Sequence, residues 1–529
     1  MKITKELYLY LLLILLMNSC SKDDEQAIIE EGPVVVVPGN ENPSMVAGIT
    51  TVVTKNEVVI EWQAATDPEN NDLTYTIILN EDVVSENQSD TAYTASSLEF
   101  NQVYTGTIVV KDTSDGTSTT NFTFETDILN TALGSELGEY PNGAIPTADD
   151  GVLIFGETQS NNFYGNYLGG SLDATVTKLD KFGNLEWVKN YGGAGTDSFH
   201  GGFKTQDNYY VLVGNTKSSD NDLSANKGGS DAWAIKIDDM GNVIWSKNYG
   251  GTGSDFFERG VETEDSNYVV AGNSYSSDGD TEGNIGLSDV FILKVNSNTG
   301  ALIWNKTIGG TGQEEVGGIV ANEDGSLILA LNSESSNFDF GLGNHGDYDS
   351  WVIKLDATGD DILWRKFYGG SGYDKVTGIV KSSSNGYLVS GITNSDDVDI
   401  DNKIGAFDGW VYKINLDGNL IWSKTYGTSS TDNIDAIATT NEGDYYLACF
   451  HNNFADGDVT EILGNRDAWL IKIDDSGAII DQKTFGGTKR DAFNGLALTT
   501  TNKVFVIGHT ESPEIENYNG DVDLYVVKY

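Results

Sequence analysis

The stretch Asp231-Ala232-Trp233-Ala234-Ile235-Lys236 decides the fold, because its pattern returns along most of the chain. An aspartate is followed two residues later by an aromatic residue and five residues later by a lysine. In the first copy Thr175 stands in place of the aromatic residue. A repeat of this regularity predicts one supersecondary unit used many times. Successive copies lie 56 to 60 residues apart, at Asp173, Asp231, Asp289, Asp349, Asp408, Asp467 and Asp523.

Each unit contains four segments with the composition of short β-strands. In one well-defined unit these segments are 260–263, 268–272, 290–295 and 302–306, separated by glycine-rich or polar turns. Four antiparallel strands in each of seven units predict a β-propeller, and a solenoid is the alternative.

The two ends of the repeat region favour the ring over the solenoid. The last unit stops at Tyr529, after its third strand, and segment 128–134 has the composition of the missing fourth strand. A ring needs complementary ends, because pairing between them removes open sheet edges, whereas a solenoid has no such need. We therefore expect an all-β protein in which residues 128–529 form a seven-bladed β-propeller, closed by the strand at Leu129.

Residues 44–127 show a different pattern, with strand signals at short, regular intervals. An early Trp62, a central strand with Tyr75, and Tyr104 followed by alternating apolar residues resemble a fibronectin type III domain. The resemblance implies a β-sandwich that serves as a spacer or a weak binding module. We interpret its acidic turn, 67–72, as a polar turn, with a calcium loop of cadherin type as the alternative.

The N-terminus has the composition of an export signal. Two lysines precede the apolar run 7–17, which is shorter than a transmembrane helix requires. The serine and cysteine that end residues 1–20 resemble the lipobox of bacterial lipoproteins, and segment 21–25 resembles the acidic export tag of surface lipoproteins in Bacteroidetes-type bacteria. The resemblance implies a signal peptide over 1–19, acylation of Cys20 and a tether over 20–43. We expect an outer membrane lipoprotein exposed on the cell surface; an unlipidated signal peptide is the alternative.

The glycine-rich unit itself resembles the β-propeller repeats of secreted and lipoprotein chains in Bacteroidetes-type bacteria. That resemblance implies the fold and leaves the activity open. The segment from Asp180 to Trp187 and its counterparts resemble the tryptophan-docking motif of quinoprotein dehydrogenases and the Asp box of sialidases, which are both structural. We interpret the tryptophans as packing between blades, and the lysines two residues after them as protection of the outermost strand from pairing with another chain.

The charge balance restricts the partners of the protein. The formal net charge is −49, with 80 Asp and Glu residues against 31 Lys and Arg residues, which disfavours nucleic acid and anionic headgroups. The two cysteines, Cys20 and Cys449, argue against a disulfide framework, and no Cys/His spacing fits structural zinc. We expect a monomer that is attached to the membrane by its lipid anchor.

The loop between the second and third strands varies from unit to unit, and in the second, third, fifth and sixth units it contains alternating aspartates. Alternating carboxylates near carbonyl oxygens suit Ca²⁺, which takes six to eight oxygen ligands. The loops match neither an EF-hand nor the nonapeptide calcium repeat, so solvated turn residues are the favoured interpretation and Ca²⁺ is the candidate cofactor. The candidate ligands are Asp220, Asp222, Asp278, Asp280, Asp396, Asp399, Asp456 and Asp458.

No residue stands out as catalytic in the sequence. Carboxylates are too abundant for any pair to indicate a glycosidase. The arginines that a sialidase needs, and the histidines, occupy unrelated places within their units. We therefore expect a non-enzymatic binding or scaffold protein that presents its acidic loop face to a glycan or a surface protein. The alternatives are a propeller polysaccharide hydrolase or lyase, and a structural component of the surface layer.

Overall fold

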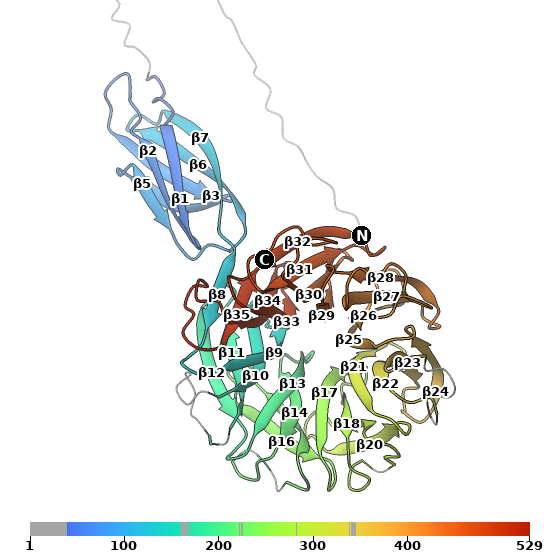
Figure 1. The fold of residues 1–529 in the computed structure, drawn as a ribbon. Helices are drawn as coiled ribbons and strands as arrows, with labels where there is room; N and C mark the ends of the chain where they lie inside the picture. The colour runs from blue at the N-terminus through green and yellow to red at the C-terminus, as the bar shows by residue number, and fades with distance from the viewer. Residues whose placement is uncertain are drawn as a thin grey trace, which may run out of the picture.

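The computed structural model describes residues 40–529 except 160–167, 170, 222, 224–225, 282, 338 and 340–344. The described residues form β-strands joined by turns and loops and contain no α-helix. They accordingly include no helix able to cross a membrane. Their strands make nine sheets, two in an N-terminal body, 40–127, and seven in a ring, 128–529 (Figure 1). The predicted signal peptide, Cys20 and most of the predicted tether lie outside the described residues.

The N-terminal body consists of two antiparallel sheets around a core of their own. The rings of Trp62 and Tyr75 meet edge to face in this core, with centroids 5.4 Å apart. Asp67 Oδ1 accepts hydrogen bonds from Glu69 N and Asn71 N at 3.0 and 2.8 Å, so the acidic turn closes on its own backbone. The sheet orders are β1-β2-β5 and β4-β3-β6-β7, with β1 (Ala47–Thr54), β2 (Glu57–Gln63), β3 (Leu73–Leu79), β4 (Asp82–Gln88), β5 (Ala92–Ala95), β6 (Val103–Asp112) and β7 (Thr117–Glu125).

Within the described residues the ring contains seven four-stranded antiparallel sheets, named ring sheets 1 to 7, whose first strands lie nearest the axis (Figure 1). Ring sheets 1 to 3 are β9 (Glu139–Pro146), β10 (Val152–Thr158), β11 (Asp173–Leu179), β12 (Leu185–Tyr191); β13 (Asp197–Lys204), β14 (Tyr210–Thr216), β15 (Asp231–Ile237), β16 (Val243–Tyr249); and β17 (Asp255–Glu262), β18 (Tyr268–Ser274), β19 (Asp289–Val295), β20 (Leu302–Ile308). Ring sheets 4 and 5 are β21 (Glu314–Ala321), β22 (Leu327–Ser333), β23 (Asp349–Leu355), β24 (Ile362–Tyr368); and β25 (Asp374–Lys381), β26 (Tyr387–Thr393), β27 (Asp408–Ile414), β28 (Leu420–Tyr426). Ring sheets 6 and 7 are β29 (Asp432–Thr439), β30 (Tyr445–Asn452), β31 (Arg466–Ile473), β32 (Ile479–Phe485); and β33 (Asp491–Leu498), β34 (Val504–Thr510), β35 (Asp523–Lys528), β8 (Leu129–Leu133).

Ring sheet 7 is built from segments far apart in the sequence. Its outer strand β8 pairs antiparallel with β35, with Leu129 opposite Lys528 and Leu133 opposite Leu524. Its first strand, β33, also contacts β9 of ring sheet 1. The predicted closure of the ring by the strand at Leu129 is confirmed by this pairing.

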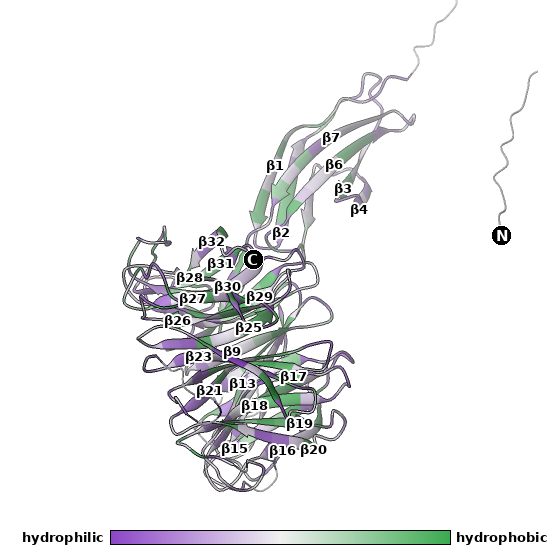
Figure 2. Cartoon of the chain, turned by 90° about the vertical axis from the view of Figure 1, so that its right-hand side faces the viewer, coloured by the Kyte–Doolittle hydropathy of each residue, from purple (hydrophilic) through white to green (hydrophobic). Residues whose placement is uncertain are grey.

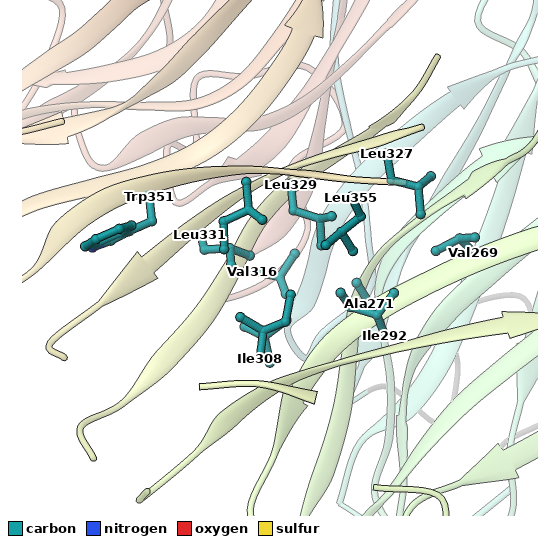
Figure 3. Packing of buried hydrophobic residues seen from close by; sticks show 12 residues of the cluster. Val269, Ala271, Ile292, Ile308, Val316, Leu327, Leu329, Leu331, Trp351 and Leu355 are labelled. Atoms are coloured by element: carbon teal, nitrogen blue, oxygen red, sulfur yellow. The ribbon is translucent and has the colours of Figure 1, made fainter. Parts of the chain in front are cut away.

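Neighbouring ring sheets bury an apolar face against each other. Val269 and Ala271 of ring sheet 3 share one buried cluster with Leu329, Leu331 and Trp351 of ring sheet 4 (Figure 3). The third strands are buried along their whole length, as in β19, because each of their faces meets another sheet. Burial on both faces explains why these strands are almost continuously apolar instead of alternating.

The tryptophans of the outer strands link neighbouring ring sheets. Trp245 Nε1 donates a 3.0 Å hydrogen bond to Ser297 O in the next sheet. A Cβ on Gly300 of the same turn would lie 2.9 Å from the indole, so the turn requires glycine there. The indoles of Trp187 and Trp422 donate in the same way to Asp239 O and Asp475 O of the sheets that follow them. The interpretation of the tryptophans as packing between sheets is confirmed.

The lysines that follow these tryptophans do more than protect an edge. Lys189 Nζ donates a 2.6 Å hydrogen bond to Met240 O, and Lys306 Nζ donates one of 2.7 Å to Asp360 O. Both acceptors belong to turns of the next ring sheet. These lysines therefore bind neighbouring sheets together, a role that the sequence did not suggest.

Ion pairs attach the N-terminal body to one end of the ring. Lys294 at the end of a third strand is nearly buried and pairs with Asp265 of a nearby turn at 2.8 Å. The equivalent Lys528 of ring sheet 7 pairs instead with Glu99 of the N-terminal body at 3.0 Å, and Glu99 also pairs with Lys181 at 3.0 Å. These contacts lie at the turn end of the ring, where short turns join first to second and third to fourth strands. Figure 2 shows the N-terminal body projecting beyond the ring.

Candidate binding site at the loop end of the ring axis

At the opposite end, the loop end, each first strand opens with a buried carboxylate. Asp255 Oδ2 accepts hydrogen bonds of 2.8 Å from Gly251 N and from Ser276 Oγ, while Oδ1 accepts from Ser274 Oγ. A Cβ on Gly250 would lie 2.3 Å from Asp255 Oδ2, so the loop approaches this closely only with glycine. The opening carboxylates are Glu139, Asp197, Asp255, Glu314, Asp374, Asp432 and Asp491.

The candidate calcium ligands bond to the backbone of the same loops. These aspartates lie in the loop between the second and third strands, and their partners lie in the glycine-rich loop before the first strand of the same sheet. The first aspartate accepts a hydrogen bond from a backbone amide at the tip of that glycine-rich loop. The second accepts one from the amide of its first glycine. The first series is Asp220, Asp278 and Asp456, which accept from Ala194 N, Thr252 N and Ser429 N at 3.0, 2.7 and 2.9 Å. The second series is Asp280, Asp399 and Asp458, which accept from Gly250 N, Gly369 N and Gly427 N at 3.1, 3.4 and 3.1 Å.

Two candidate ligands do not take part in these bonds. Asp396 is exposed, and its neighbour Asp397 accepts the 2.7 Å bond from Ser371 N instead. Asp222 lies outside the described residues. Over the part of the chain that the structure describes, no three His, Cys, Asp or Glu side chains are grouped to hold a metal ion. Ca²⁺ binding by these loops stays a prediction.

A β-bulge in every first strand provides an extra residue at the axis. In β13 the pairing register shifts between Phe199 and Gly201, so His200 is the extra residue. Bulges commonly redirect a side chain and are frequent next to functional sites. The bulged residues lie three positions after the opening carboxylates and differ from sheet to sheet: Asn142, His200, Glu258, Gly317, Thr377, Asp435 and Asn494.

All seven bulged residues line one axial cavity. Its inner part, of about 240 Å³, is walled mainly by glycines and small apolar residues of the first strands. Its mouth, of about 360 Å³, is polar: Glu157, Ser198 and Arg259 line it together with every bulged residue except Gly317, and Arg259 also lines the inner part. Glu157 lies near the end of a second strand and Ser198 near the start of a first strand, so the mouth is at the loop end.

An ion pair and an arginine form one side of the mouth. His200 Nδ1 and Glu258 Oε1 are 3.1 Å apart. Burial lowers the pKa of His200, but the hydrogen bond and the charge of Glu258 outweigh it, so the pKa is raised overall. Burial raises the pKa of Glu258, but His200 and nearby cations bring it below its ordinary value. Arg259 donates to the carbonyl oxygens of Gly317, Glu258 and Thr377 at 3.0, 2.8 and 3.1 Å, and so ties three ring sheets together.

Asp435 contributes a carboxyl group whose pKa is raised, in contrast to that of Glu258. Burial raises its pKa to about 7, against a 2.6 Å hydrogen bond from Asn433 and the charges of Arg466 and Arg259. Near neutral pH Asp435 is therefore partly protonated, while Glu258 is ionised. Two carboxyl groups whose pKa values move apart in one cavity can serve as a proton donor and a proton acceptor.

The residues that precede the opening carboxylates and the third-strand aspartates form the loop-end rim around the mouth. Parallel backbone bridges join them across neighbouring sheets, at Ser230–Ser254, Ser288–Gln313, Tyr348–Tyr373, Phe407–Thr431 and Arg466–Arg490. The rings of Tyr348 and Tyr373 have centroids 5.4 Å apart, and those of Tyr373 and Phe407 are 6.1 Å apart. The rim thus changes from serines to aromatic residues to arginines around the ring.

The sequence pattern did not indicate this site. The histidines and arginines share no place within the repeat, but the structure gathers His200, Arg259, Arg466 and Arg490 at the loop end. The sequence does carry a signal three residues after each opening carboxylate. The residue at this position differs from unit to unit, whereas the residues on either side of it mostly repeat. Recognising it required knowing that a bulge turns this position toward the axis.

No protein-family model matches the chain. The chain is 27% identical over 223 residues to the regulatory protein FlaEY of Caulobacter vibrioides, a match that covers 37% of this chain and 22% of that protein. The chain therefore matches less than a quarter of the length of this relative.

Several solved enzyme structures share parts of the arrangement. A gluconolactonase from Xanthomonas campestris is 10% identical with a TM-score of 0.32, over 76% of this chain and 89% of that one. The PQQ-bound aldose sugar dehydrogenase from Streptomyces coelicolor is 12% identical with a TM-score of 0.29, over 76% and 98%. A rhamnogalacturonan lyase from Bacillus licheniformis is 14% identical with a TM-score of 0.21, over 84% and 76%. At these TM-scores the likeness carries no conclusion about activity.

Proposed function

We propose that the chain is a lipid-anchored binding protein of the cell surface, in which a fibronectin type III-like domain carries a seven-bladed β-propeller whose axial cavity receives part of a glycan. The export signal, Cys20 and the acidic segment after it support the anchorage. Seven four-stranded sheets around one axis support the propeller (Figure 1). The observation that carries the binding role is the set of diverging bulged residues in a cavity open at the loop end.

The character of the cavity favours a sugar over an apolar ligand. Its mouth, of about 360 Å³, lies within the roughly 300–1,000 Å³ range of small-molecule sites. Amide, hydroxyl, imidazole, guanidinium and carboxyl groups alternate around it, so donors and acceptors are closely spaced. Sugar hydroxyl groups both donate and accept, which suits such a lining.

The attachment of the N-terminal body supports presentation of this mouth. Glu99 and Asn101 contact Lys528 and Lys503 at the turn end of the ring. The mouth lies at the opposite end of the ring from these contacts and remains open to large ligands.

A glycan array probed with the full-length protein in detergent tests the binding role. We expect selective binding that weakens about tenfold or more in Asp435→Asn, which keeps the shape of the side chain but removes its charge. Met240→Ala changes an exposed residue at the turn end and should bind like the wild type. Failure to bind any glycan, with the protein folded, would remove the proposal.

A polysaccharide hydrolase or lyase is the second candidate, favoured by the opposed pKa shifts of Asp435 and Glu258. In hydrolysis Asp435 would donate a proton to the leaving oxygen while Glu258 takes one from water. Turnover of a panel of polysaccharides, abolished in Glu258→Gln with binding retained, would establish the enzyme. Binding without turnover in the wild type would leave the binding role alone.

A further inference from the structure

Arginine is scarce in this chain and concentrated at the loop end. The sequence has four arginines against 80 acidic residues. Arg259 lines the mouth, and a backbone bridge joins Arg466 to Arg490 on the rim. The charges of Arg466 and Arg259 both act on Asp435, which places these groups around one side of the mouth. The fourth, Arg365, is exposed on the outer strand β24.

Folding does not account for the rim pair of arginines. The Arg466 guanidinium lies 4.2 Å from the centroid of the Phe450 ring, and its Nε donates to Asn452 Oδ1 at 3.3 Å. Neither Arg466 nor Arg490 forms an ion pair with a carboxylate among the described residues, although acidic residues outnumber basic ones. Burial and the charge of Arg490 lower the pKa of Arg466, against the opposing charges of Asp435 and Glu511. The two guanidinium groups thus lie close together despite their repulsion, with donors left for an external anion.

Aromatic side chains continue the rim on the other side of ring sheet 6. Tyr348, Tyr373 and Phe407 form a half-buried cluster through two ring contacts. The C–H faces of sugar rings stack on aromatic rings of this kind, while sugar carboxylates match the planar fork of a guanidinium. Both kinds of group occur here within one rim and beside one polar cavity.

We propose that the loop-end rim between ring sheets 4 and 7 recognises a uronic acid-containing polysaccharide. Arg466 and Arg490 receive a sugar carboxylate, and the Tyr348–Tyr373–Phe407 cluster holds the neighbouring sugar rings. The assignment rests on the glycan-binding role proposed above and specifies its ligand. Guanidinium binds carboxylate in a bidentate manner, so the site prefers an acidic sugar over its neutral counterpart.

Calorimetry on the full-length protein in detergent tests the assignment with three probes. The probes are an oligogalacturonide, the same oligosaccharide with its carboxyl groups reduced to hydroxymethyl groups, and a sulfated galactan oligosaccharide. We expect the oligogalacturonide to bind at least about tenfold more tightly than the reduced form, with an affinity that falls as salt rises. Equal affinity for the two would overturn the carboxylate assignment and leave the glycan-binding role standing. Preference for the sulfated probe would also overturn it, and binding of no probe or array glycan would remove both proposals.

Matched variants locate the site. Arg466→Gln and Arg490→Gln together should remove the preference for the acidic probe while leaving the weak binding of the reduced probe. Arg365→Gln removes the same charge from an exposed outer strand and should change nothing. A loss of acidic preference in Arg365→Gln equal to that of the double variant would show a nonspecific charge effect and contradict the assignment. Unchanged thermal unfolding of both the double variant and Arg365→Gln shows that the fold is retained.

Discussion

At the scale of the residue, the first glycine of each loop-end turn allows the turn that leaves one sheet to pack directly against a buried carboxylate at the junction with the next sheet. Gly250 has φ of 134° and the hypothetical Cβ contact of 2.3 Å with Asp255 described above. Asp255 cannot withdraw, because two serines and a backbone amide hold it. The repeated Gly-Gly pairs therefore follow from the carboxylate as much as from the backbone conformation.

We predict that Gly250→Ala destabilises the protein by about 3 kcal/mol or more. Left-handed strain alone costs roughly 1–2 kcal/mol, and the clash with a fixed carboxylate adds to it. Gly283→Ala is the matched control, since φ is 104° there and the nearest atom to its Cβ would be 3.8 Å away. Urea denaturation measures both variants, and equal losses would show that the carboxylate contact adds nothing.

A second prediction concerns Asp349, the buried aspartate that begins β23. Its Oδ2 accepts a 2.6 Å bond from His345 N, and the backbone amide of Gly346 also acts on this buried carboxyl group. Burial and the neighbouring Asp374 raise its pKa to about 6. The folded state therefore holds this proton more tightly than the unfolded chain. The resulting stability is complete below a pH of about 4 and is lost as the pH rises through about 6.

Asp349→Asn removes that loss, so the variant should gain stability relative to the wild type as the pH rises from 5 to 8. Only the part of the titration between pH 5 and about 6 lies in this range, so the gain is at most roughly 1.4 kcal/mol. Asp361→Asn, at an exposed position, should show no such pH dependence. Chemical denaturation at the two pH values measures the difference, and a gain that is the same at both would refute the assignment.

At the scale of the element, the outer strand β8 decides whether the ring is closed. It supplies Ala132, fully buried, opposite Tyr525 of β35. Without β8 the backbone of β35 would present an unpaired sheet edge, which is prone to association with other chains. One short strand thus protects the sheet on which the whole ring ends.

We predict that Ala132→Glu destabilises the protein by about 3 kcal/mol or more, because it buries an unpaired charge in the closing sheet. Asn130→Glu places the same residue at an exposed position of the same strand and should stay within about 0.5 kcal/mol of the wild type. Limited proteolysis should cleave only the first variant near residue 128. Comparable stability of the two variants would mean that β8 contributes little to closure.

At the scale of the whole molecule, buried carboxyl groups at the sheet junctions act together on stability. Burial raises the pKa of Glu139 to about 7 and that of Asp289 and Asp432 to about 6, as for Asp349. Each prefers its proton in the folded state, so each loses its contribution as the pH rises from 5 to 8. Burial lowers the pKa of His451 and His509, which favours their neutral form and acts in the opposite sense.

The carboxyl groups are more numerous, so we predict a melting temperature several degrees higher at pH 5.5 than at pH 8. Many proteins reach maximal stability between these values, and most lose carboxylate interactions on the acid side. Differential scanning calorimetry at constant ionic strength measures the trend. A melting temperature that rises steadily toward pH 8 would contradict it.

The sequence predicted the strands and the closure of the ring, because both depend on local apolar patterns and on turn residues that repeat. It could not predict the axial site, since the bulge at His200 depends on pairing between strands and not on the residue itself. The hydrogen bonds of the acidic loops could not be predicted for a related reason. Asp278 and Asp280 look like free ligands in the sequence, but their partners are backbone amides of Thr252 and Gly250, about 30 residues away in the chain.

The pairing of β8 with β35 also determines when the ring can close as the chain is synthesised. Synthesis delivers the chain from its N-terminus, so β8 emerges before all the other ring strands and β35 after them. The N-terminal body can fold early, but the ring must wait for its final strand. Synthesis that stops early leaves β8 without its partner and an open sheet edge accessible to proteases. The closing strand therefore makes a durable ring depend on synthesis of the chain through its last strand.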